Sequence, residues 1–107
     1  MTTFDDREKA HEAKFARDEE MAFRVTARRN RLVGQWAAAR MGLTPEETDS
    51  YSKSVVQADF EEAGDEDVVR KLLSDLAAAG VETAEEDVRR ALVETMIEAR
   101  RQLMESM

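Results

Sequence analysis

Residues 1–40, MTTFDDREKAHEAKFARDEEMAFRVTARRNRLVGQWAAAR, decide the fold because they are expected to form one long helix with two unlike halves. The half up to Glu20 is dense in charge, and its apolar residues are only Phe4, Ala10, Ala13, Phe15 and Ala16. From Met21 onward the sequence becomes amphipathic. Its apolar stripe, at spacings of seven, four and three, is Val25, Leu32, Trp36 and Ala39, widened by Val33 and Ala37. The second half is therefore predicted to join a core, whereas residues 1–20 form a protruding or mobile arm.

A second helix is predicted after Gly42, a residue that suits the left-handed end of the first. Thr44-Pro45-Glu46-Glu47 combines a capping threonine, a proline at the first helical position and a glutamate three residues after the cap. The apolar face of this helix is thin and consists of Tyr51, Val55 and Ala58, with Val56 or Phe60 beside them. We therefore expect the second helix to pack through fewer residues than the others.

Two further helices are indicated by their boundaries and by their apolar stripes. Gly64 ends the second helix, Asp65 is placed to cap the third, Gly80 closes the third, and Thr83 with Glu86 repeats the capping pattern for the fourth. The third helix carries Val69, Leu72, Leu73 and Leu76. The fourth carries Val88, Leu92, Thr95 or Met96, Ala99 and Leu103, broadened by Val93 and Ile97.

The composition agrees with a small helical protein. The chain has 107 residues, 42% of them hydrophobic, with one Pro and four Gly, which favours helix over strand. We predict one all-α domain over residues 1–107: a four-helix bundle at 21–107 and the arm at 1–20. Its core is expected to come from the second half of the first helix and from the third and fourth helices.

The charge pattern limits the partners that the chain can bind. The net charge is −8, yet residues 1–40 hold nine basic against seven acidic residues, and the remainder is strongly acidic. An acidic protein is a poor general ligand for nucleic acid, because phosphate repels it. The N-terminus lacks an apolar segment of signal-peptide length, and no run approaches a membrane span. A cytoplasmic, soluble monomer that does not insert into membranes is the expectation.

The sequence offers little for catalysis. His11 is the only histidine and lies in the charged arm, so no nucleophile–base arrangement can be assembled around it. It is either a solvated helix residue or a pH-sensitive contact. There is no cysteine, and the sequence holds no calcium-loop spacing and no phosphate-binding glycine loop. We therefore expect neither an enzyme nor a metal site.

Two features remain open to more than one interpretation. Arg17, Arg24, Arg28 and Arg31 lie along one side of the first helix, at spacings of seven, four and three. They form either a solvated edge paired with the acidic second helix or an anion site, in which Arg24, Arg28 and Arg31 would hold nucleotide phosphates. In the arm, Phe4, His11 and Phe15 share one face at spacings of seven and four. They are either part of an inactive terminal segment or anchors for a groove in a partner.

Several stretches resemble the zeta subunit of the alphaproteobacterial F-type ATP synthase. They include Met1 to Ala10, Glu12 to Ala16 and Arg28 to Ala37, and the similarity continues past Gly80 to the C-terminus. The resemblance implies a four-helix protein that inhibits ATP hydrolysis. Its N-terminal segment would wedge into a catalytic interface of the head, between the large alternating subunits and near the rotor stalk. Such a protein is cytoplasmic and peripheral to the inner membrane. It requires no cofactor, and ATP or ADP can act as a regulatory ligand.

By that resemblance the arm carries inhibition from position 3 to position 19. The residues implied are Thr3, Phe4, Asp5, Asp6, Arg7, Glu8, Lys9, His11, Glu12, Lys14, Phe15 and Glu19. Two other readings stay open. One is a regulatory module that binds adenine nucleotide in its bundle, and the other is a helical adaptor for a different complex.

Overall fold

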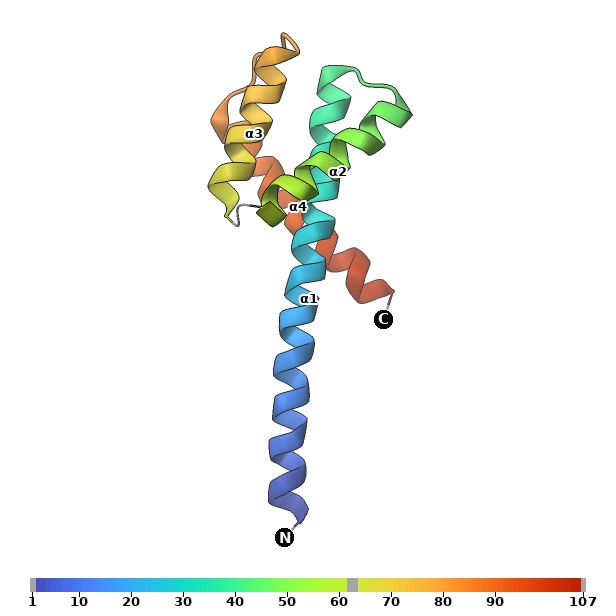
Figure 1. Ribbon diagram of the computed structural model, residues 1–107, viewed down its shortest axis with the longest axis vertical. Coiled ribbons are helices and arrows are strands. Elements are labelled where there is room, and N and C mark those ends of the chain that lie inside the picture. The colour runs from blue at the N-terminus through green and yellow to red at the C-terminus, as the bar shows by residue number, and fades with distance from the viewer. Residues whose placement is uncertain (1, 62–63, 107) are drawn as a thin grey trace.

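The computed structural model describes the backbone of residues 2–61 and 64–106, and the side chains of residues 19–61 and 64–106. It contains four helices (Figure 1): α1 (Thr2–Met41), α2 (Pro45–Glu61), α3 (Asp65–Ala78) and α4 (Glu85–Glu105). No strand occurs among these described residues. The predicted all-α, four-helix fold with a long first helix is therefore confirmed. None of the described helices combines the length and the apolarity needed to cross a membrane.

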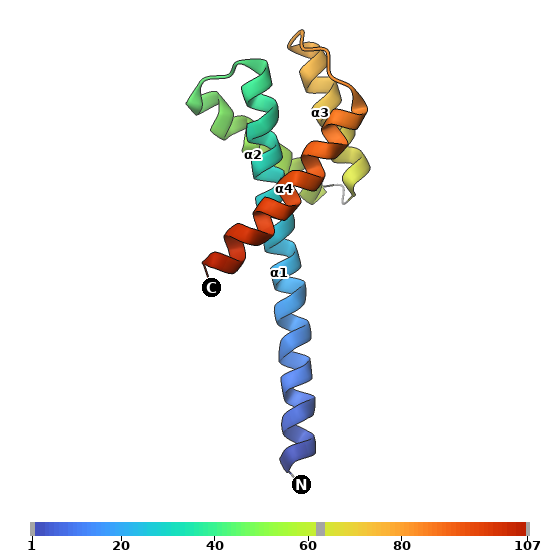
Figure 2. The same ribbon diagram turned by 180° about the vertical axis from the view of Figure 1, so that it is seen from behind.

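Helix α1 is the central strut of the molecule. Its 40 residues correspond to roughly 60 Å at 1.5 Å per residue, and the whole molecule measures 66 × 25 × 22 Å. Its C-terminal half passes between α2 on one side and α4 on the other, as Figures 1 and 2 show from opposite directions. Its N-terminal half extends away from the other three helices. The arm of the sequence prediction is thus a continuation of the strut.

The core is apolar and draws on all four helices. Its buried residues are Val33, Ala37, Val55, Val68, Val69, Leu72, Leu76, Val88, Ala91 and Leu92, with Trp36, Met41, Tyr51, Leu73 and Val81 packed against them. On α1 the predicted stripe was only partly right, since Ala39 is exposed and Leu32 and Trp36 are partly buried. Val25, Val33 and Ala37 are buried as predicted, and Ala38, which was not predicted, is buried as well. The buried face differs because α2 and α4 cover α1 from two sides.

Helix α2 contributes more than its thin apolar face predicted. Only Ser52 and Val55 of α2 are buried, fewer than on α3 or α4, which agrees with the expectation, yet the contact of α2 with α1 is among the most extensive in the molecule. The reason is steric: a Cβ atom on Gly34 would lie 2.8 Å from the Cα atom of Ser52. A glycine facing a serine lets the two backbones approach closely, and the Ser52 hydroxyl donates to the Thr48 carbonyl at 2.8 Å. At the Gly34–Ser52 contact, small residues let the two helices approach closely.

Only one of the three predicted side-chain caps is present. At α2 the Glu47 N–H donates to Thr44 Oγ1 at 3.2 Å, and the Glu47 carboxylate accepts the Thr44 N–H at 2.9 Å, which confirms the capping box. The N-cap positions of α3 and α4 fall on Gly64 and Ala84, whose side chains cannot cap. The predicted Asp65 and Thr83 caps were therefore wrong. Helix α3 begins at Asp65 itself, so Asp65 lies inside the helix. Helix α4 begins at Glu85, one residue later than a cap at Thr83 would require.

The helical periodicity of α4 also predicted the wrong burial for two large apolar residues. Val93 and Ile97 were predicted to broaden the buried stripe, but both are exposed. The buried residues of α4 are Val88, Ala91, Leu92 and Ala99. Because α4 crosses α1 instead of running alongside it, α1 covers a narrow face of α4 and leaves the neighbouring apolar positions uncovered.

Candidate functional site

The candidate site begins with the arm, residues 2–20, where α1 leaves the bundle. Glu19 is exposed, and Glu20 forms an ion pair with Arg24 at 2.7 Å. The side chains of the other predicted arm residues lie outside the described residues: Thr3, Phe4, Asp5, Asp6, Arg7, Glu8, Lys9, His11, Glu12, Lys14 and Phe15. Their backbone belongs to α1. Positions 4, 11 and 15 therefore fall on one side of a continuous helix, as predicted from the spacing.

The exposed arginines of α1 contact three different elements. Arg24 pairs with Glu20 of its own helix, Arg28 donates to Gln102 Oε1 of α4 at 3.0 Å, and Arg31 pairs with Asp49 of α2 at 3.2 Å. Lys53 first, and then Arg31, lowers the pKa of the Asp49 carboxyl. The Arg31 contact matches the interpretation of a basic edge paired with the acidic second helix. The nucleotide site at Arg24, Arg28 and Arg31 stays a prediction, which amide shifts on addition of ATP can test.

A buried polar network joins α1 to α2 and α3 near the base of the arm. The Arg29 side chain is 3% exposed, and its guanidinium donates to Asn30 Oδ1 at 2.8 and 3.1 Å and to Asp65 Oδ1 at 2.8 Å. The Asn30 amide donates to Asp59 Oδ2 at 2.7 Å, while Asp59 Oδ1 accepts the Gly64 N–H at 3.4 Å. A buried charge needs such partners, because its desolvation is costly. The network thus ties three helices together at one point.

The sequence did indicate this network, although a search for apolar residues at helical spacing does not find it. Arg29 lies four residues before Val33 and four after Val25, and Asn30 lies three before Val33. Both polar residues therefore occupy core positions of the helix. Polar residues at core positions call for partners elsewhere in the chain. Which residues serve as partners depends on the fold, and here they are Asp59 and Asp65.

An aromatic pair lies at the same junction, on the outer surface. The rings of Phe23 on α1 and Phe60 on α2 meet edge to face, with centroids 6.4 Å apart and planes at 80°. The two side chains are 60% and 70% exposed. A depression of about 410 Å³ borders them, lined also by Ala22, Thr26, Ala27 and Val56, with Asn30 and Asp59. We call Phe23, Phe60, Ala22, Thr26, Ala27 and Val56 the aromatic shoulder.

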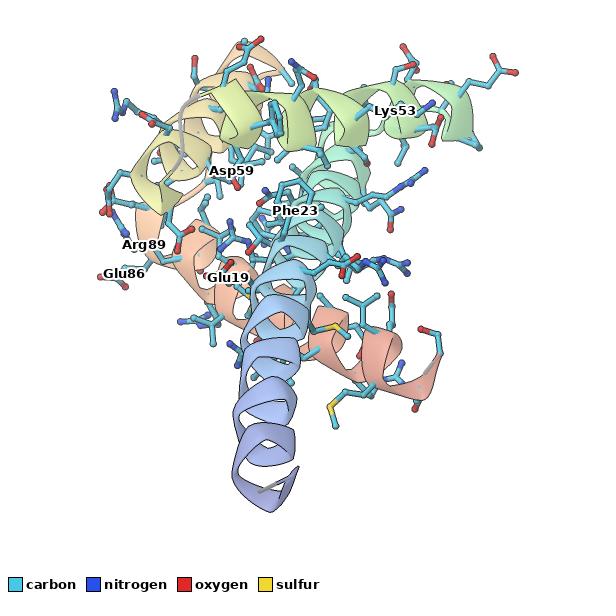
Figure 3. The ribbon with its side chains drawn as sticks, turned by 60° about the horizontal axis from the view of Figure 1, so that its bottom comes forward. Glu19, Phe23, Lys53, Asp59, Glu86 and Arg89 are labelled. Carbon is cyan, nitrogen blue, oxygen red and sulfur yellow. The ribbon has the colours of Figure 1, made fainter. Side chains whose placement is uncertain are left out.

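Figure 3 locates the aromatic shoulder relative to the arm. Phe23 and Asp59 lie where α1 and α2 cross, and Glu19 lies on α1 farther towards the arm. The prediction that Phe60 could join the apolar face of α2 was wrong, because its ring packs on Phe23 at the surface. Phe23 was not recognised from the sequence at all. The sequence did offer a signal for it, because Phe23 is an aromatic residue in a charged stretch, about one turn from the arm.

Several other aromatic and charged residues make contacts that stabilise the fold. Trp36 packs against the core, and the Arg40 guanidinium lies over its ring at 4.7 Å. Glu66 binds Arg89 with both carboxylate oxygens, at 2.9 and 3.0 Å, which lowers the pKa of the Glu66 carboxyl. Figure 3 shows Glu86 beside Arg89 on α4. Within residues 19–61 and 64–106, no group of three or more His, Cys, Asp and Glu side chains is arranged to hold a metal ion.

Comparisons with known proteins identify the family of the chain. A structure determined by solution NMR is similar to it, with 44% sequence identity and a TM-score of 0.72 over 81% of this chain and 99% of that one. A comparison with curated proteins found no match. The family model for ATPase inhibitor subunit zeta matches residues 1–102, which is nearly the full length. The chain therefore belongs to the family of ATPase inhibitor subunits zeta.

Proposed function

We propose that residues 3–19 inhibit ATP hydrolysis by entering a catalytic interface in the head of the F-type ATP synthase. Membership of the inhibitor family supports a regulatory role at the synthase. The observation that supports the arm as the inhibitory element is the division of α1. Among the residues of α1 whose side chains the structure describes, from Glu19 on, the buried ones begin at Val25, whereas the helix itself starts at Thr2. The backbone of α1 thus runs for more than five turns before Val25, and its N-terminal half extends away from the other three helices (Figure 1).

The physical properties of the arm suit insertion into a partner. Phe4 and Phe15 are large apolar residues on one side of a helix that is otherwise charged. Ordering a helix costs roughly 1–2 kcal/mol per residue, so an isolated charged helix is marginal and gains most from a gap that encloses it. We propose that this gap lies between the large alternating subunits, near the rotor stalk. The chain then acts at the cytoplasmic periphery of the inner membrane, where the synthase holds it.

Removing the arm tests this function. Deleting residues 1–19 should abolish inhibition of purified ATP synthase and leave the melting temperature nearly unchanged, because the deleted residues precede the core. ATP hydrolysis and circular dichroism measure the two effects. A finer test replaces Phe4 and Phe15 by Ala, with Ala10→Ser and Ala13→Ser as the control on other sides of the helix. Full inhibition by the truncated chain would contradict the proposal.

A further inference from the structure

The aromatic shoulder exposes more apolar surface than its place in the bundle explains. Phe23 is 60% and Phe60 is 70% exposed, although each ring already packs on the other. Exposed aromatic residues that gather in one patch are typical of interaction surfaces. The polar groups beneath are already engaged, since the Asn30 amide donates to Asp59 and Asp59 also accepts the Gly64 N–H. The shoulder is therefore suited to an apolar partner and not to a polar ligand.

The shoulder directly continues the arm. Phe23 lies four residues after Glu19, which is about one helical turn or roughly 6 Å along the axis. Positions 22 and 26 follow position 15 at spacings of seven and four, so Ala22 and Thr26 extend the side of α1 that holds positions 4, 11 and 15. A partner that encloses residues 3–19 along this side must end beside the shoulder. The surface is thus continuous with the proposed inhibitory interface.

We propose that the aromatic shoulder docks on apolar side chains at the rim of the catalytic interface that receives the arm. This inference rests on the proposed function and adds a second contact to it. The rings are already held edge to face across α1 and α2, so docking freezes little further motion. Buried aromatic anchors carry much of the binding energy in protein interfaces. Because α1 is continuous and is held between α2 and α4, the shoulder also sets how deeply the arm enters.

The test uses the full-length chain with ATP synthase from which the native inhibitor has been removed. Phe23→Ala, Phe60→Ala and the double variant should each raise the concentration for half-inhibition by about tenfold or more. Phe60→Leu should retain part of the affinity, because it keeps an apolar side chain. Ile97→Ala and Met104→Ala are matched controls on α4, since these side chains are 63% and 72% exposed, and neither should change inhibition. Circular dichroism melts verify that each variant is folded.

A direct contact assay complements the kinetics. A photoreactive benzophenone amino acid at position 60 should crosslink to a head subunit of the purified synthase, whereas the same group at position 97 should not. If the Phe23 and Phe60 variants inhibit like the wild type, the docking proposal for the aromatic shoulder is wrong, whereas the proposal that the arm inhibits is unaffected. Failure of the wild type itself to inhibit would overturn the proposed function. Crosslinking of position 60 to a second copy, with a dimer in sedimentation that Phe60→Ala disrupts, would also overturn the docking proposal.

Discussion

The contact between Gly34 and Ser52 sets the distance between α1 and α2. A Cβ atom at position 34 would lie 2.8 Å from Ser52 Cα, a distance that real Cβ atoms essentially never show. The opposing atom belongs to the backbone, so it cannot rotate away as a side chain could. Close packing of interiors turns even one extra methyl group into strain. Gly34 is thus required by its neighbour and not by its own backbone conformation.

Replacing Gly34 by Ala should therefore destabilise the protein, by roughly 1–3 kcal/mol. The sign is informative, because Ala in place of Gly within a helix otherwise stabilises by about 1 kcal/mol. Urea denaturation measures the free energy of unfolding. Gln35→Ala, at the exposed position next to it, is the control and should change stability little. A more stable Gly34→Ala variant would contradict the close crossing.

The buried polar network offers a second comparison between single residues. Asp59 is nearly buried and accepts the Asn30 amide, whereas the Asp65 side chain is mostly exposed. Asp59→Ala should lower the free energy of unfolding by roughly 1–3 kcal/mol, because it leaves a buried donor unpaired. Asp65→Ala should cost less, because water can replace the exposed Asp65 carboxylate and the Arg29 guanidinium keeps its hydrogen bonds to Asn30. Chemical denaturation of the two variants checks this order, and equal losses would refute it.

At the scale of the element, the starts of α2 and α4 look alike in sequence but differ in structure. Each has a threonine followed three residues later by a glutamate, Thr44 with Glu47 and Thr83 with Glu86. Thr44 and Glu47 exchange both capping hydrogen bonds. Helix α4 begins at Glu85, and Thr83 Oγ1 is buried without a hydrogen-bond partner in the described part of the chain. Sequence similarity between two helix starts therefore does not ensure the same cap.

The matched substitutions should separate these two helix starts. Thr44→Ala should cost about 1 kcal/mol of stability, since it removes a formed cap. Thr83→Ala should be close to neutral or slightly stabilising, because it removes a buried hydroxyl that is left unpaired. Thermal and urea unfolding of both variants provide the measurement. A loss at Thr83 as large as the loss at Thr44 would mean that its hydroxyl does cap α4.

At the scale of the whole molecule, some surface ion pairs link two helices and others lie within one helix. Glu66 on α3 binds Arg89 on α4, and Asp49 on α2 binds Arg31 on α1. Hydrogen bonds from Arg101, and then from Gln102, lower the pKa of the Glu98 carboxyl from 4.5 to about 2. Each of these carboxyl groups has a folded pKa below its unfolded value. Their contributions are thus fully present above about pH 4.5.

Acid should remove this stabilisation. The pKa of Glu98 in the folded chain is about 2. As the pH falls from about 4.5 towards that value, these carboxylates take up protons and their ion pairs are lost, so the melting temperature should fall. Circular dichroism melts between pH 7 and pH 2.5 measure the effect. Glu98→Gln should show a shallower decline, because one of the titrating groups is gone. An acid profile identical to that of the wild type would contradict the assigned role of Glu98.

Four helices, their approximate limits and the division of the first helix followed from the sequence by itself. These are local properties: helical periodicity, turn glycines and one capping box all lie within a few residues of the structure that they specify. The composition of residues 1–20 likewise marked them as a helix with little to bury. The resemblance to the inhibitor family followed from the same residues, and the family match over residues 1–102 confirmed it.

Only the tertiary structure decided which faces are buried and which polar residues meet. Periodicity reports the amphipathicity of one helix, whereas burial depends on where other helices cross it. For that reason Ala39, Phe60 and Ile97 are exposed, although each lies in or beside an apolar stripe. The same long-range crossings bring Gly34 against Ser52 and Arg29 against Asp65, and they assemble Phe23 and Phe60 into one surface. These contacts join residues at least 18 positions apart, beyond the reach of any local pattern.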